Sequence, residues 1–101
     1  MATPLEVRTA RADDGRTTVI AVGELDMSNV EVFAEAVAAA NPGGAGSTLL
    51  IDLTEVDYLD SSAINVLFEH ARTIELVVNP IVAPVLTHSG LADIVDVTSA
   101  R

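Results

Sequence analysis

The stretch "LLIDLTEVDYLDSSAINVLFEHAR", residues 49–72, indicates the fold class of the chain. Residues 48–53 are nearly all apolar, which is typical of a strand that is covered on both faces of a sheet. After a polar connection, apolar side chains recur from Ile64 to Ala71 at the spacing of one helix face, so we expect a helix that ends near residue 72. A buried strand that leads into an amphipathic helix indicates an α/β domain.

Four further segments have the alternating or β-rich pattern of strands. They lie at residues 5–9, 17–23, 74–78 and 93–97. The first two flank a turn centred on Asp14 and Gly15, and we expect them to pair antiparallel.

The helix pattern occurs twice more. Residues 29–40 place their apolar side chains on one face, and Ser28 with Glu31 has the spacing of a capping box, in which both side chains accept from unpaired backbone amides. A shorter helix is expected between Pro84 and Gly90. The order of elements predicts a mixed β-sheet of about four or five strands packed against three or more α-helices, with any C-terminal helix short or absent.

Composition limits the classes of function. The chain has 101 residues, which suits a single domain over 1–101, and a net charge of −10 with no Lys. Nucleic acid requires clustered basic residues, so we expect no nucleic-acid partner. The absence of Cys excludes disulfides and cysteine catalysis. We see no secretion signal and no apolar stretch of the ~18–20 residues that span a bilayer, so we expect no membrane insertion and a cytoplasmic location.

The sequence offers little support for catalysis, a metal or a cofactor. The glycine-rich residues 42–47 lack the Lys of a phosphate-binding loop and precede a strand. His70 and His88 stand alone, and no G-x-S-x-G motif is present, so we expect no enzyme. Four acids could bind a divalent cation, but their spacing differs from that of a calcium loop, and it favours a solvated acidic edge. They are Asp52, Glu55, Asp57 and Asp60.

Asp60, Ser61 and Ser62 stand together at the start of the expected second helix. The simpler interpretation is a helix cap, because Asp and Ser oxygens accept from unpaired amides. The cap needs only one of these residues, however, and sites gather where the strands of α/β sheets end. A further hydroxyl at a helix N-terminus suits a phosphoryl group, since free amides and the helix dipole favour an anion. The local sequence leaves both interpretations open.

Three segments together resemble the STAS domain of bacterial anti-sigma factor antagonists. They are "GELDMSNVEVF" (23–33), "LLIDLTEVDYLDSSAINVLFEHAR" (49–72) and "VLTHSGLADIVDV" (85–97), within a resemblance that covers residues 5–98. The resemblance implies a STAS-like fold and a non-enzymatic cycle. The unmodified antagonist binds an anti-sigma factor that is also a serine kinase using ATP, a sigma factor is released, phosphorylation ends the binding, and a serine phosphatase reverses the modification.

The resemblance also implies the site residues. The phosphorylated serine corresponds to Ser62, with Ser61 as the alternative. A partner-binding face would comprise Asp26, Ser28, Asn29, Asp60, Ser61, Ser62 and Ala63. The family usually has Gly where this chain has Ala63, whose methyl group could hinder a partner. A homodimer is also compatible with the family.

Two other functions fit the resemblance. STAS domains also serve as subunits of lipid-transport ATP-binding cassette complexes, in which the serine is not switched. A third alternative is a STAS module that binds a nucleotide, although nothing in the chain resembles a phosphate loop.

Overall fold

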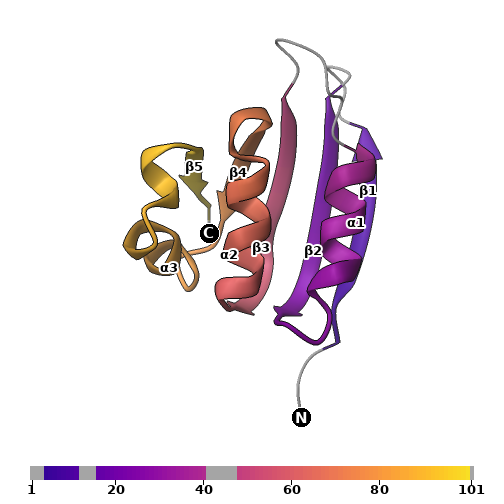
Figure 1. Ribbon diagram of the computed structural model, residues 1–101, viewed down its shortest axis with the longest axis horizontal. Coiled ribbons are helices and arrows are strands. Elements are labelled where there is room, and N and C mark those ends of the chain that lie inside the picture. The colour runs from indigo at the N-terminus through magenta and orange to yellow at the C-terminus, as the bar shows by residue number, and fades with distance from the viewer. Residues whose placement is uncertain (1–3, 12–15, 41–47, 101) are drawn as a thin grey trace.

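The computed structural model describes residues 4–11, 16–40 and 48–100, and from residue 17 onward strands alternate with helices (Figure 1). The elements are β1 (Glu6–Arg11), β2 (Thr17–Leu25), α1 (Val30–Ala40), β3 (Leu49–Leu59), α2 (Ser61–Glu69), β4 (Ile74–Val78), α3 (Ala83–His88) and β5 (Asp96–Ser99). Short 3-10 helices lie at Ala71–Thr73 and Leu91–Asp93. The predicted mixed sheet with three helices is confirmed.

The five strands form one sheet in the order β1-β2-β3-β4-β5. The pair β1–β2 is antiparallel, as predicted, and the other pairs are parallel. Helices α1 and α2 cover the same face (Figure 1). Because β2 and β3 are parallel, their carboxyl ends meet at one edge of the sheet, where Leu25 lies opposite Leu59.

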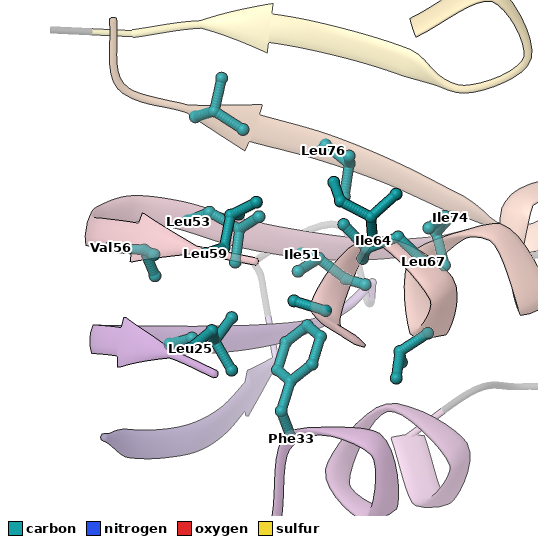
Figure 2. Close-up of a cluster of buried hydrophobic side chains, with 14 of the residues drawn as sticks. Leu25, Phe33, Ile51, Leu53, Val56, Leu59, Ile64, Leu67, Ile74 and Leu76 are labelled. Carbon is teal, nitrogen blue, oxygen red and sulfur yellow. The ribbon is translucent and has the colours of Figure 1, made fainter. Parts of the chain in front are cut away.

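The core fills the space between the sheet and the helices (Figure 2). Phe33 of α1 and Leu67 of α2 meet Ile51 of β3 there, and each of these side chains is buried. Burying one such side chain stabilises a fold by roughly 1.5–3 kcal/mol. Among the described core residues every buried apolar side chain except Phe33 is aliphatic, so mainly aliphatic packing holds these layers together.

The structure corrects two expectations for β3. Its residues alternate between buried and half-buried, and Leu50 is only half-buried on the face away from the helices. The prediction that residues 48–53 are covered on both faces is therefore wrong, because the described helices pack on one face. The strand also continues to Leu59, so residues 54–59 are strand and not a connection.

Smaller differences concern the ends of elements. Helix α2 ends at Glu69, earlier than predicted, and a 3-10 turn leads into β4. Pro84 lies in the first turn of α3, where its missing N–H is tolerated. Strand β5 starts at Asp96, later than predicted, because a 3-10 turn comes after Gly90, whose φ is 86°. The predicted turn at Asp14 and Gly15 and the loop 41–47 lie outside the described residues.

Candidate functional site

Asp60 caps helix α2. Its backbone is extended, with φ −113° and ψ −171°, and its carboxylate accepts a hydrogen bond from the Ser62 amide at 2.9 Å. The Ser62 hydroxyl donates to the same oxygen, Oδ1. The capping interpretation of Asp60 is confirmed. The Ser62 hydroxyl is also part of the cap, because it donates to the capping carboxylate.

These contacts hold Asp60 in its charged form. The Ser62 hydroxyl is the main cause that lowers the pKa of the Asp60 carboxyl, and the backbone amides of Ser62, Met27 and Ala63 add to it. Partial burial opposes the shift. Asp60 is therefore an anion at neutral pH, directly beside the Ser62 hydroxyl.

The three residues at the start of α2 differ in exposure. Ser61 is exposed, Ser62 is half-buried, and Ala63 is 0% exposed. Ser62 is thus not sealed in the core, which would have ruled out its modification. The Ala63 methyl group lies in the core, so it cannot itself contact a partner or obstruct one.

The turn between β2 and α1 lies beside Asp60, since the Asp60 amide donates to the Leu25 carbonyl at 3.2 Å. Within this turn the Asp26 carboxylate accepts from the Ser28 amide at 2.9 Å and from the Ser28 hydroxyl. The predicted capping box is therefore wrong, because the Ser28 hydroxyl donates to Asp26 and is not oriented as a cap acceptor. Asp26 lies closer to Ser28 in sequence than Glu31 does and supplies the competing carboxylate.

Asn29 fixes the same turn through both ends of its side-chain amide. Its Oδ1 accepts from the Asp26 amide at 3.0 Å, and its Nδ2 donates to the Glu24 carbonyl at 2.9 Å. The structure thus brings Asp26, Ser28 and Asn29 next to Asp60 at the end of the parallel strands (Figure 1). Whether they bind a partner stays a prediction.

The "GELD" segment begins with Gly23, whose backbone conformation favours glycine. Its φ is 111°, a conformation that residues with a Cβ rarely adopt. The pairing of β2 with β3 shifts register between Gly23 and Glu24, which marks a bulge. The bulge aligns Leu25 with Leu59 and so places Asp26 next to the start of α2.

Asn79 supports the site, although no sequence pattern predicted this role. It is 9% exposed, and its Nδ2 donates to the carbonyls of Thr54 at 3.0 Å and Val56 at 2.8 Å. Its Oδ1 accepts from the amides of Ile81 at 2.8 Å and Val82 at 3.1 Å. Asn79 thereby ties the β4–α3 connection to the part of β3 that extends past β4 and leads to the α2 cap. The Asn-Pro pair signals a turn, but no local pattern reveals these long-range bonds.

Charge is unevenly distributed between the two ends of the sheet. The edge around Asp60 carries the acids Glu24, Asp26 and Asp57. Arg11, Arg16 and Arg72 lie at the opposite edge, where β2 and β4 begin, and Arg16 forms an ion pair with Glu75 at 3.2 Å. Among the described residues no group of three or more His, Asp or Glu could hold a metal ion, so the acidic edge has no metal-binding arrangement there.

Two further features bear on the alternatives. A pocket of about 740 Å³ opens at the end of the molecule opposite Asp60, and no residue of the Asp60 site lines it. Its walls are Ala38, Phe68, Glu69, His70, Ala71, Arg72, Thr73 and Ile94. Within residues 4–11, 16–40 and 48–100, none of the helices has the length and apolar character required to span a bilayer.

A family model and several solved structures match this chain. The family described as "Mlab, STAS domain" matches residues 9–96. An anti-sigma factor antagonist from Mycobacterium paratuberculosis superposes with a TM-score of 0.85 at 22% identity, over 99% of this chain and 92% of that one. No curated protein matches the sequence.

Two further solved structures share the fold. SpoIIAA, an anti-sigma factor antagonist in its unphosphorylated form, has a TM-score of 0.73 at 21% identity, over 95% of this chain and 89% of that one. An anti-sigma-factor antagonist (STAS) domain protein from Planctomyces limnophilus has a TM-score of 0.73 at 20% identity, over 94% and 91%. At these identities the likeness establishes the fold alone.

Proposed function

The chain belongs to the STAS domain family, and we propose that it is an anti-sigma factor antagonist that is switched off by phosphorylation of Ser62. In this cycle the unmodified chain binds an anti-sigma factor that is also a serine kinase, and a sigma factor is released. The kinase transfers the γ-phosphoryl group of ATP to the Ser62 oxygen, the hydroxyl proton leaves, and the complex dissociates. A serine phosphatase then hydrolyses the phosphoserine. The chain itself is not an enzyme and acts in the cytoplasm.

The observation that carries the proposal is the position of the Ser62 hydroxyl, which is half-buried beside a charged carboxylate at the end of the sheet. Phosphorylation removes the proton that Ser62 donates to Asp60 and adds about −1.5 to −2 charges next to that anion. The Ser62 amide is already bound by Asp60, and the Ala63 amide donates to the Asp60 carbonyl at 3.1 Å. The phosphate must therefore compete with Asp60 for the helix amides, which changes the surface around Ser62.

The structural neighbours support this role. Those described above are named anti-sigma factor antagonists, and one of them, SpoIIAA, is described in its unphosphorylated form. A phosphorylation cycle is therefore consistent with this fold. Ser61 remains the alternative acceptor because it is more exposed than Ser62, while the family pattern favours Ser62.

The test is phosphorylation by the cognate anti-sigma kinase with ATP, followed by mass spectrometry of the peptides. We expect one phosphate on Ser62 in the wild-type chain and in Ser61→Ala, and none in Ser62→Ala. Binding of unmodified Ser62→Ala to the anti-sigma factor should be retained. Modification confined to Ser61, or none at all, would contradict the proposed switch.

A second candidate is a STAS subunit of a lipid-transport ATP-binding cassette complex, in which Ser62 is not switched. The matching family bears the name Mlab and not that of a sigma regulator, so the family match alone does not select the antagonist role. Affinity purification from the native organism distinguishes the two, since recovery of a transporter ATPase supports the second function and recovery of a sigma regulator supports the first.

A further inference from the structure

Two large apolar side chains are exposed at the end of the β2–β3 pair that leads to Asp60. Met27, in the turn after β2, is 80% exposed, and Tyr58, near the end of β3, is 50% exposed. Single exposed apolar residues are common on protein surfaces. Both residues lie at the same end of the β2–β3 pair, because Tyr58 pairs with Glu24 and the Met27 amide contacts the Asp60 carboxylate.

The charges around these side chains have a single sign. Residues 24–29 and 54–62 contain several acids and no Arg, Lys or His. A partner with complementary charge therefore carries Lys or Arg against Glu24 or Asp57. A partner that was basic throughout would bind a phosphorylated Ser62 more tightly, which is the opposite of the proposed switch. Release on phosphorylation therefore requires that the partner surface facing Ser62 be apolar, since an anion is costly to bury in an apolar contact.

We propose that Met27 and Tyr58 are the apolar anchors of the docking surface around Ser62, and that the anti-sigma factor covers them with an apolar pocket whose rim carries Lys or Arg. This inference rests on the proposed function and adds the chemistry of the partner's surface. Met27 lies in the turn that contacts Asp60, so a phosphate on Ser62 would be introduced into the same contact. Tyr58 points away from the helices, since its neighbour Leu59 is buried in the core, so its contribution is the smaller one.

The experiment measures the affinity of the unmodified chain for its full-length anti-sigma factor by calorimetry or biolayer interferometry. Met27→Gln keeps the length of the side chain but makes it polar, and Tyr58→Thr keeps a residue that favours strands. Ile94→Thr is the matched control, because Ile94 is 57% exposed but lines the pocket at the opposite end. Circular dichroism checks that each variant is folded.

We expect Met27→Gln to weaken binding about tenfold or more, mainly through faster dissociation, with a smaller loss for Tyr58→Thr. Ile94→Thr should bind like the wild type. Raising the salt concentration from about 0.05 to 0.3 M should slow the association of the wild type and of every variant with the anti-sigma factor. The reason is that salt screens the attraction between the acidic residues and the partner's basic rim. Equal affinity of Met27→Gln and the wild type would overturn the inference while leaving the proposed function intact. A wild-type chain that binds no anti-sigma factor would overturn both.

A double-mutant cycle tests the link to the switch. A charge at residue 62 could act by disrupting the contact between Met27 and the anti-sigma factor. In that case Ser62→Asp should reduce the binding affinity less in the Met27→Gln background than in the wild type. Strictly additive losses would show that the two positions act independently and would contradict this explanation of release.

Discussion

The turn that begins at Asp26 and the turn that begins at Asp60 lie next to each other and use the same contacts. In each, the carboxylate accepts from the amide of a serine two residues later at 2.9 Å, and the hydroxyl of that serine donates to the same oxygen. The two turns differ in their position relative to the next helix. Ser62 is already in the first turn of α2, whereas Ser28 precedes α1, which begins at Val30.

Exposure differs accordingly, since Ser28 is exposed and Ser62 is half-buried. A group added to Ser28 extends into solvent from a turn that Asn29 also stabilises. A group added to Ser62 meets the cap of a helix whose next residue, Ala63, is in the core. The same short motif is therefore a surface turn in one place and part of a packed helix start in the other. The second placement brings a charge on serine closer to the packed core.

The largest expected effect comes from placing a charge in each turn. Ser62→Asp should weaken binding to the anti-sigma factor by more than a hundredfold, which corresponds to about 3 kcal/mol. Ser28→Asp, the matched variant, should weaken binding by about tenfold or less, about 1.4 kcal/mol, because Ser28 lies on the predicted partner-binding face but is exposed to solvent. Calorimetric titration of both variants provides the measurement, and equal losses would show that the two turns are functionally equivalent.

The second effect concerns the carboxylates themselves. Asp60→Ala should lower the free energy of unfolding by about 1 kcal/mol, and by up to about 2, because the amide of Ser62 loses its cap. Asp26→Ala removes an exposed turn contact and should cost about 0.5 kcal/mol or less. Urea denaturation followed by circular dichroism measures both, and a larger loss for Asp26→Ala would reverse the ranking of the turns.

A third variant concerns the residue that ties the Asp60 turn to the core. Ala63→Gly should lower the free energy of unfolding by about 1 kcal/mol, since glycine is unfavourable within a helix. The rate of Ser62 phosphorylation should stay the same, because the Ala63 methyl group is 0% exposed and cannot obstruct a kinase. A clear gain in phosphorylation rate, measured with radiolabelled ATP, would mean that this methyl group does hinder the partner.

The smallest effect is the pH dependence of the Asp60 cap. The folded-state pKa of Asp60 is lowered, so its contribution to stability is fully present above the unfolded value of about 3.9 and is lost as the pH falls through the folded value. Asp60→Asn retains a capping oxygen but does not titrate. The difference in urea midpoint between wild type and Asp60→Asn should shrink as the pH is lowered from neutral to about 3. A difference that grows on acidification would contradict the charged cap.

Much of the fold is determined by sequence patterns that act locally. The apolar spacing in α1 and α2 and the preference of Asp for helix starts are sufficient to predict the helices and the Asp60 cap. The extension of β3 through residues 54–59 could not be predicted in this way. It depends on the bulge at Gly23 and on bonds from Asn79 to carbonyls more than twenty residues away in sequence. The Ser28 capping box failed because two acids, Asp26 and Glu31, compete for the Ser28 amide, and their spacing alone does not decide between them.

Asn79 also covers a part of β3 that would otherwise be open to pairing with another strand. Strand β4 pairs with β3 only as far as Leu53, so within the described part of the chain no strand lies beside the next residues of β3 on that side. The single amide of Asn79 takes the hydrogen-bonding place that a neighbouring backbone would fill, by donating to Thr54 and Val56. Without it, these carbonyls would form an open sheet border on which a strand from another molecule could add, which is the first step towards aggregation.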